Sequence, residues 1–204
     1  YLKKKSIGIK TVRSITGFLL KIHNNTINDK IVPLTVDHRN YWDIKYRLEY
    51  LEVHSSRRSK DKIKKLVKIF KNRKYCLVHG DLNTKNIILK EDGTACMIDF
   101  EETAFSDPAH DTGKIIGHLI IFEEMGSVNN EDIRWMLEHY LMRIKLSNKT
   151  RLRESIIMHA ACAILSRISG RLRYGFIPYE ARLKLKEKAE NMITDPKASL
   201  RSVL

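Results

Sequence analysis

The hydrophobic pattern of this chain changes abruptly near its middle, and the change limits the folds that the chain can adopt. Residues 75–79, 86–90 and 94–100 form short apolar runs that are typical of strands. The sequence Glu-Asp-Gly at residues 91–93 predicts a tight turn between the last two runs. On both sides of this segment, apolar residues recur every three to four positions, as they do in helices. We therefore expect a mostly α (α+β) fold, with a helical body and a few short central β-strands.

The helical body is predicted from the spacing of its apolar residues. In the clearest segment, Ile63, Leu66, Val67 and Phe70 lie on one face of a helix, and the residues between them are mostly lysine. The other helices are expected at residues 10–23, 41–54, 112–125, 131–145, 150–169 and 179–193. There is no internal repeat, and 204 residues are about the size of one domain, so we treat residues 1–204 as a single unit.

Composition excludes several classes of protein. The 38 Lys and Arg exceed the 24 Asp and Glu by 14 charges, but 43% of the residues are hydrophobic, so the chain can form a core. The three cysteines have no C-x-x-C spacing, which argues against a disulfide framework or a cysteine zinc site and favours reduced thiols in a cytoplasmic protein. The longest apolar runs, 115–122 and 156–165, are shorter than the roughly 20 residues of a membrane helix, so we expect no membrane span.

The densest group of polar residues lies in the strand segment, as His-Gly-Asp-Leu-Asn-Thr-Lys-Asn at residues 79–86. Asp99 follows the tight turn, and the predicted hairpin folds it back toward this loop. Asn86 and Asp99 offer the oxygen ligands that Mg²⁺ prefers. Asp81 is then left to accept a hydrogen bond from an incoming hydroxyl group. A group that orients a nucleophile, placed beside a cation site, is the arrangement that phosphoryl transfer requires.

The motif H-G-D-x-x-x-x-N followed by I-D-F-E resembles the catalytic core of the aminoglycoside phosphotransferase and choline kinase family, a branch of the protein-kinase-like fold. The resemblance is strong over residues 75–125. It implies ATP as co-substrate, Asp81 as catalytic base, and Asn86 and Asp99 as ligands of Mg²⁺. Asp111 resembles the aspartate of the family that opens a core helix and steadies the catalytic loop. Protein kinases have Arg and Gly where this chain has Gly80 and Glu101, so a protein kinase is disfavoured.

The other polar residues of the segment have competing interpretations. Lys85 neighbours the expected metal site and is expected either to contact a phosphate or to lie in solvent. Glu101 and Glu102 follow Asp99, and one of them is expected to reach metal or substrate, or both are surface acids. His79 ends a strand and is expected to support the catalytic loop structurally rather than to transfer a proton. Taken singly, the Asp and Asn residues are also common in turns and helix caps.

Kinases of this kind also need a preceding lobe that covers the nucleotide phosphates. This chain has no G-x-G-x-x-G motif, and the segment before residue 10 is too short to form such a lobe. We therefore expect a C-terminal lobe, with the catalytic loop and metal-binding segment at residues 75–113 and a helical body at residues 10–74 and 112–204. The N-terminal lobe is expected in a longer protein, and residues 1–204 by themselves are expected to turn over poorly.

The basic residues leave a second interpretation open. Residues 57–74 contain ten Lys or Arg and the single acid Asp61, which is typical either of a solvated helix face or of a surface that binds a polyanion such as RNA. A catalytically incomplete kinase-like module that binds such a polyanion is the alternative function. Further basic residues in the later helices, Arg167 among them, disfavour a polycationic aminoglycoside as acceptor. They favour a neutral or acidic hydroxyl compound, whose identity the sequence leaves open.

Overall fold

The computed structural model describes residues 6–27, 50, 55–169 and 172–198, and it is mostly helical in this part of the chain. Its helices agree with the predicted segments to within a few residues. They are α1 (Ile9–Thr26), α3 (Arg57–Lys71), α4 (Ala109–Glu124), α5 (Asn130–Arg143), α6 (Lys149–Ser169) and α7 (Tyr179–Thr194). The helix predicted at residues 41–54 lies outside the described residues except for Tyr50. None of the helices described here is long and apolar enough to cross a membrane.

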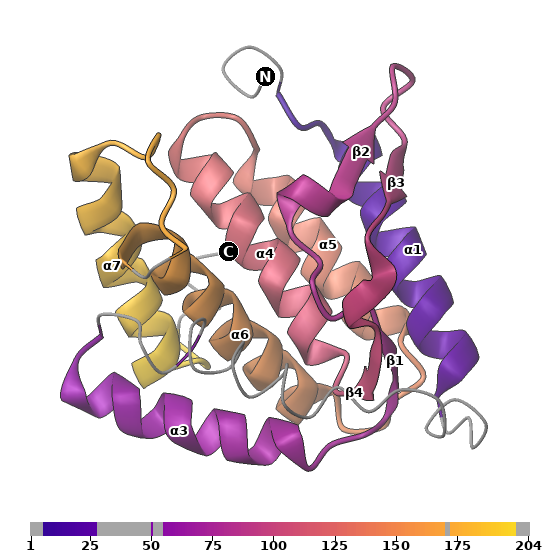
Figure 1. Ribbon diagram of the computed structural model, residues 1–204, viewed down its shortest axis with the longest axis horizontal. Helices are drawn as coiled ribbons and strands as arrows, with labels where there is room; N and C mark the ends of the chain where they lie inside the picture. The colour runs from indigo at the N-terminus through magenta and orange to yellow at the C-terminus, as the bar shows by residue number, and fades with distance from the viewer. Residues whose placement is uncertain (1–5, 28–49, 51–54, 170–171, 199–204) are drawn as a thin grey trace.

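The strand segment forms two separate antiparallel pairs. β2 (Ile87–Leu89) pairs with β3 (Ala95–Met97), so Ile87 lies opposite Met97 and the turn is a hairpin, as predicted. β1 (Cys76–Val78) pairs instead with β4 (Ala104–Ser106), a strand that the sequence pattern does not predict. The three residues of β4 carry no alternating or β-branched pattern, so their strand conformation depends on the pairing with β1. Figure 1 shows both pairs on the side of the helical body where α1 lies.

Helix α4 runs through the centre of the molecule beside α6 (Figure 1). Every residue from Ala109 to Phe122 is buried, so α4 is buried on all its faces and lacks the one-sided pattern of a surface helix. The two helices approach closely because α4 has glycine at the contact. A Cβ atom on Gly117 would lie 2.5 Å from the Ala160 carbonyl oxygen, and one on Gly113 would lie 2.5 Å from that of Ile156.

Helix α3 packs its apolar stripe inward and leaves its charged face to solvent. Ile63, Leu66 and Val67 are buried, whereas Lys64 and Lys65 are exposed. The amphipathic pattern of residues 57–71 therefore describes a surface helix at the edge of the body (Figure 1).

The close α4–α6 contact predicts the effect of adding one methyl group. We expect Gly117→Ala to lower the free energy of unfolding by about 1–3 kcal/mol, because the new Cβ meets backbone that cannot move aside cheaply. The matched control is Gly17→Ala on the exposed side of α1, where nothing lies within 4 Å of the new atom. That change should raise stability by roughly 0.5–1 kcal/mol through helix propensity. Urea denaturation measures both, and equal stability of the Gly117 variant and the wild type would contradict this packing.

Candidate active site

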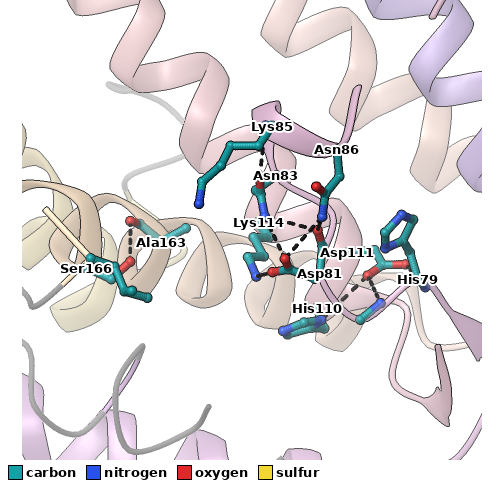
Figure 2. Close-up of polar contacts among 12 residues, drawn as sticks. His79, Asp81, Asn83, Lys85, Asn86, His110, Asp111, Lys114, Ala163 and Ser166 are labelled. Atoms are coloured by element: carbon teal, nitrogen blue, oxygen red, sulfur yellow. Dashed lines mark hydrogen bonds and ion pairs between the residues drawn. The ribbon is translucent and has the colours of Figure 1, made fainter. Parts of the chain in front are cut away.

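The loop at residues 79–86 is held in place by a single buried carboxylate from another element. Asp111 lies in the first turn of α4 and has no solvent exposure. The His79 backbone N–H donates to its Oδ2 at 2.6 Å, and the Gly80 N–H donates to its Oδ1 at 3.1 Å. Gly80 has a φ of 84°, a left-handed conformation that favours glycine. Figure 2 shows the Asp111 carboxylate beside His79, where the loop starts. Asp111 is thus a loop brace and does not cap α4, whose N-cap residue is Pro108.

Two histidine rings lie beside the buried carboxylate of Asp111. His23 Nε2 lies 3.4 Å from its Oδ2, and His110 Nδ1 lies 3.6 Å from its Oδ1. Burial acts to raise the pKa of Asp111, but these neighbouring rings outweigh burial and hold the pKa well below its usual value. The Tyr140 hydroxyl, 2.8 Å from His23 Nδ1, fixes the first of the two rings. The brace is therefore an ionised carboxylate, which forms stronger hydrogen bonds to N–H groups than a neutral side chain does.

Asp81 has both carboxylate oxygens in defined hydrogen bonds. Its Oδ2 accepts from the side-chain amides of Asn83 at 2.9 Å and Asn86 at 3.1 Å. Its Oδ1 accepts from Lys114 Nζ at 2.7 Å. The Asp81 side chain is 24% exposed, against 4% for Lys114. The carboxylate is therefore fixed in orientation and still reachable from solvent.

Lys114 is the residue that the sequence analysis missed. It lies three positions after Asp111 on α4, so the two side chains emerge on neighbouring parts of one helix face and both reach the loop (Figure 2). Lysine is almost never buried unless it is paired. A lysine directly before the apolar run at 115–122 was thus a signal for a buried acidic partner, although the sequence did not identify which one.

Asn86 closes a short 3₁₀ turn, Thr84–Asn86, that Asn83 caps by accepting a hydrogen bond from the Lys85 N–H at 2.9 Å. The Asn86 amide nitrogen donates to both the backbone carbonyl and the carboxylate of Asp81. The Asn86 amide oxygen makes no hydrogen bond to any residue that the structure describes. Asn86 therefore contacts Asp81 through its amide nitrogen, and no described residue occupies its amide oxygen.

Asp99 is brought to the same end of the hairpin through its backbone. The Ile98 N–H donates to the Asn86 carbonyl at 3.0 Å, and the His79 ring nitrogen Nε2 bonds to the Ile98 carbonyl at 2.9 Å. Asp99 has φ 66° and ψ 63°, and among the described residues it is the only one other than glycine with a positive φ. Such a conformation costs on the order of 1–3 kcal/mol and is concentrated at functional sites.

The residues present fit a hard cation, though with a small donor set. No group of three or more His, Cys, Asp or Glu suited to a metal occurs within the described residues. Mg²⁺ commonly takes one or two protein oxygens and completes its coordination with water and phosphate. The Asn86 amide oxygen and the exposed Asp99 carboxylate are such oxygens. Asp81 and Asn86 are in direct contact, whereas no hydrogen bond in the described part of the chain joins Asp99 to either of them.

The remaining candidates differ in their surroundings. His79 is buried, with its ring against Phe100 at a centroid separation of 4.6 Å, so its contacts are those of a structural residue. Lys85 is exposed and extends from the loop toward the side of Asp81 on which α6 lies (Figure 2). Glu101 is exposed in the turn Phe100–Glu102, and Glu102 is buried. Of these four residues, only Lys85 and Glu101 are exposed to a ligand from solvent.

The model of a family described as "Phosphotransferase enzyme family" matches residues 21–135. This stretch covers more than half of the chain and contains Asp81, Asn86, Asp99, Asp111 and Lys114. No curated protein matches the chain.

Proposed function

Because this chain belongs to the phosphotransferase enzyme family, we propose that it transfers the γ-phosphoryl group of ATP to a hydroxyl group of a small molecule, with Mg²⁺. The observation that carries the proposal is the fixed, accessible carboxylate of Asp81. Two amides orient one of its oxygens, and an ammonium group holds the other. A carboxylate held in this way is suited to orient a hydroxyl nucleophile, the task that phosphoryl transfer assigns to the protein.

In the proposed reaction, the acceptor hydroxyl donates its hydrogen bond to the Asp81 carboxylate. Its oxygen forms the new bond to the γ-phosphorus while the bond from phosphorus to the bridging oxygen of ATP breaks. ADP leaves with that oxygen, and the hydroxyl proton passes to Asp81. Lys114 Nζ, 2.7 Å from Asp81 Oδ1, keeps the carboxylate in place and brings a positive charge to the region where negative charge is transferred.

Asn86 and Asp99 would hold the magnesium ion through the Asn86 amide oxygen and the Asp99 carboxylate. When bound, the ion offsets negative charge on the β- and γ-phosphates. The hydrogen bonds of Asn86 and His79 to the backbone of Ile98 keep the Asp99 segment beside the loop. Lys85 and Glu101 remain candidates for contacts to phosphate, metal or substrate.

The direct test removes the charge of Asp81. We expect Asp81→Asn to lower ADP release by the full-length protein about 10²–10⁴-fold across a panel of hydroxyl compounds, because the amide cannot accept the proton. Nucleotide binding should persist, since the proposed metal ligands Asn86 and Asp99 are unchanged. Asp61→Asn on the exposed face of α3 is the matched control and should be as active as the wild type. Asp99→Asn should lower activity and raise the Mg²⁺ concentration needed for half-maximal rate. Full activity of the Asp81 variant would overturn the proposal.

A second candidate, binding of a polyanion such as RNA, is favoured by the exposed basic face of α3. Lys64 and Lys65 are exposed, and neither forms an ion pair with any described residue. We expect Lys64→Glu combined with Lys65→Glu to weaken binding of a single-stranded RNA and to reduce its salt dependence by about 0.7 in slope per lost phosphate contact. The control is Arg143→Glu combined with Lys145→Glu, which makes the same change in net charge at exposed residues near the end of α5. Equal weakening by both pairs would indicate nonspecific charge attraction and reject a binding surface on α3.

A further inference from the structure

Two cations are buried in the described part of the chain, Lys114 and Arg167, and their surroundings differ. Lys114 forms an ion pair with Asp81 at 2.7 Å. Arg167, on α6, is 5% exposed and pairs with no carboxylate among the described residues. A guanidinium group that is taken out of water without an acidic partner is unfavourable, so a buried arginine is ordinarily paired. Among the described residues, the buried charge of Arg167 thus has no carboxylate paired with it.

The hydrogen bonds of Arg167 do not compensate for this. Its Nη1 donates to the Leu172 carbonyl at 3.5 Å, the long limit for a hydrogen bond, and its Nε has no acceptor in the described residues. Its Cζ lies 5.3 Å from the centre of the Tyr174 ring. The guanidinium is therefore held against an aromatic face and keeps donors to spare. The planar N–H donors of a guanidinium group match the geometry of a carboxylate or phosphate.

Arg167 is close to the catalytic loop. The Tyr174 backbone N–H donates to the Arg167 carbonyl at 2.8 Å, and the Tyr174 hydroxyl lies 3.5 Å from Thr84 Oγ1. Thr84, three residues after Asp81, begins the 3₁₀ turn that ends at Asn86. The neighbouring residue on α6, Ser166, appears on the same side of Asp81 as the Lys85 side chain in Figure 2. Arg167 is thus linked to the catalytic loop through the ring of Tyr174.

We propose that Arg167 is an oxyanion-binding subsite for the acceptor, which carries a carboxylate or phosphate group in addition to its reacting hydroxyl. The subsite lies outside residues 21–135, so the family match assigns it no role. Tyr174 and Phe176, stacked at 5.1 Å, form an aromatic wall beside it, and Phe176 is half exposed. Exposed Lys85 adds positive charge on the same side. That the anion belongs to the acceptor rests on the proposed function, but the subsite itself does not.

Inorganic phosphate at constant ionic strength is the probe for the subsite. We expect phosphate to raise the melting temperature of the full-length wild type and to bind in calorimetry. Arg167→Met should weaken that binding about 10- to 100-fold, the range of one to two charge-assisted hydrogen bonds, and Arg167→Lys should restore part of it. No phosphate response in the wild type, or an equal response in Arg167→Met, would overturn the proposal.

Two control variants separate an anion site from other roles. Arg182 donates to the carbonyls of Ile177 and Tyr174, so Arg182→Met removes support from the same loop without removing Arg167. Lys85→Met removes a cation at the catalytic loop. Arg182→Met should bind phosphate as the wild type does, and Lys85→Met should weaken the binding by much less than Arg167→Met does. A loss of binding in either of them equal to that in Arg167→Met would assign the effect to the loop or to a nucleotide-phosphate site, and would reject the subsite.

If Arg167→Met fails to fold, an NMR titration of the wild type with phosphate still tests the subsite. Phosphate should shift one arginine Nε–Hε NMR signal, assigned through its absence in Arg167→Lys, and an unmoved signal rejects the subsite.

ADP release with glycerol, glycerate and glycerol 3-phosphate then tests the link to the acceptor. Faster turnover of one or both anionic compounds, lost in Arg167→Met, supports the link and identifies the anion. A preference for glycerol contradicts it. Phosphate binding without turnover of any hydroxyl compound would instead count against the proposed function.

Discussion

The geometry of the site depends on one buried carboxylate, that of Asp111. A chain that turns sharply after a strand leaves backbone N–H groups without partners, and in a buried place these must be satisfied. Asp111 accepts two of them, from His79 and Gly80, and ring nitrogens of His23 and His110 lie 3.4 and 3.6 Å from its oxygens. Because it belongs to α4, the loop is attached to the most deeply buried helix of the body. The position of Asp81 therefore follows from the packing of the core.

Helix α4 links stability and chemistry in a second way. Its residues 111 and 114 extend toward the loop, while Gly113 and Gly117 face α6 and let the two helices approach closely. The orientation of α4 about its own axis therefore determines both which residues pack on α6 and where Lys114 points. The C-terminal part of α6 carries Arg167, whose contact with Tyr174 leads back to Thr84 of the loop. Elements far apart in the chain therefore converge on one region.

The sequence predicted what local patterns control. Helical periodicity located α1 and α3 to α7 to within a few residues. The spacing of Asp81, Asn86 and Asp99 predicts that they share one site; Asn86 donates to Asp81, and no hydrogen bond in the described residues joins Asp99 to either of them. Features that depend on distant partners were not predictable in this way. The strand conformation of β4 depends on β1, the ion pair of Lys114 joins residues 33 apart, and the unbalanced charge of Arg167 is visible only once its surroundings are known.

Amide hydrogen exchange at His79 and Gly80 tests most directly whether Asp111 orders the loop. In Asp111→Asn, protection of these two amides should fall about 10- to 100-fold, the equivalent of about 1.5–3 kcal/mol for a hydrogen bond to a charged group, while amides within α6 keep theirs. Asp107→Asn is the matched control, because Asp107 is also buried next to α4 but bonds to Arg73 and the Ala109 N–H instead. Undiminished protection of His79 and Gly80 in Asp111→Asn would contradict the role of Asp111 as the brace of the loop.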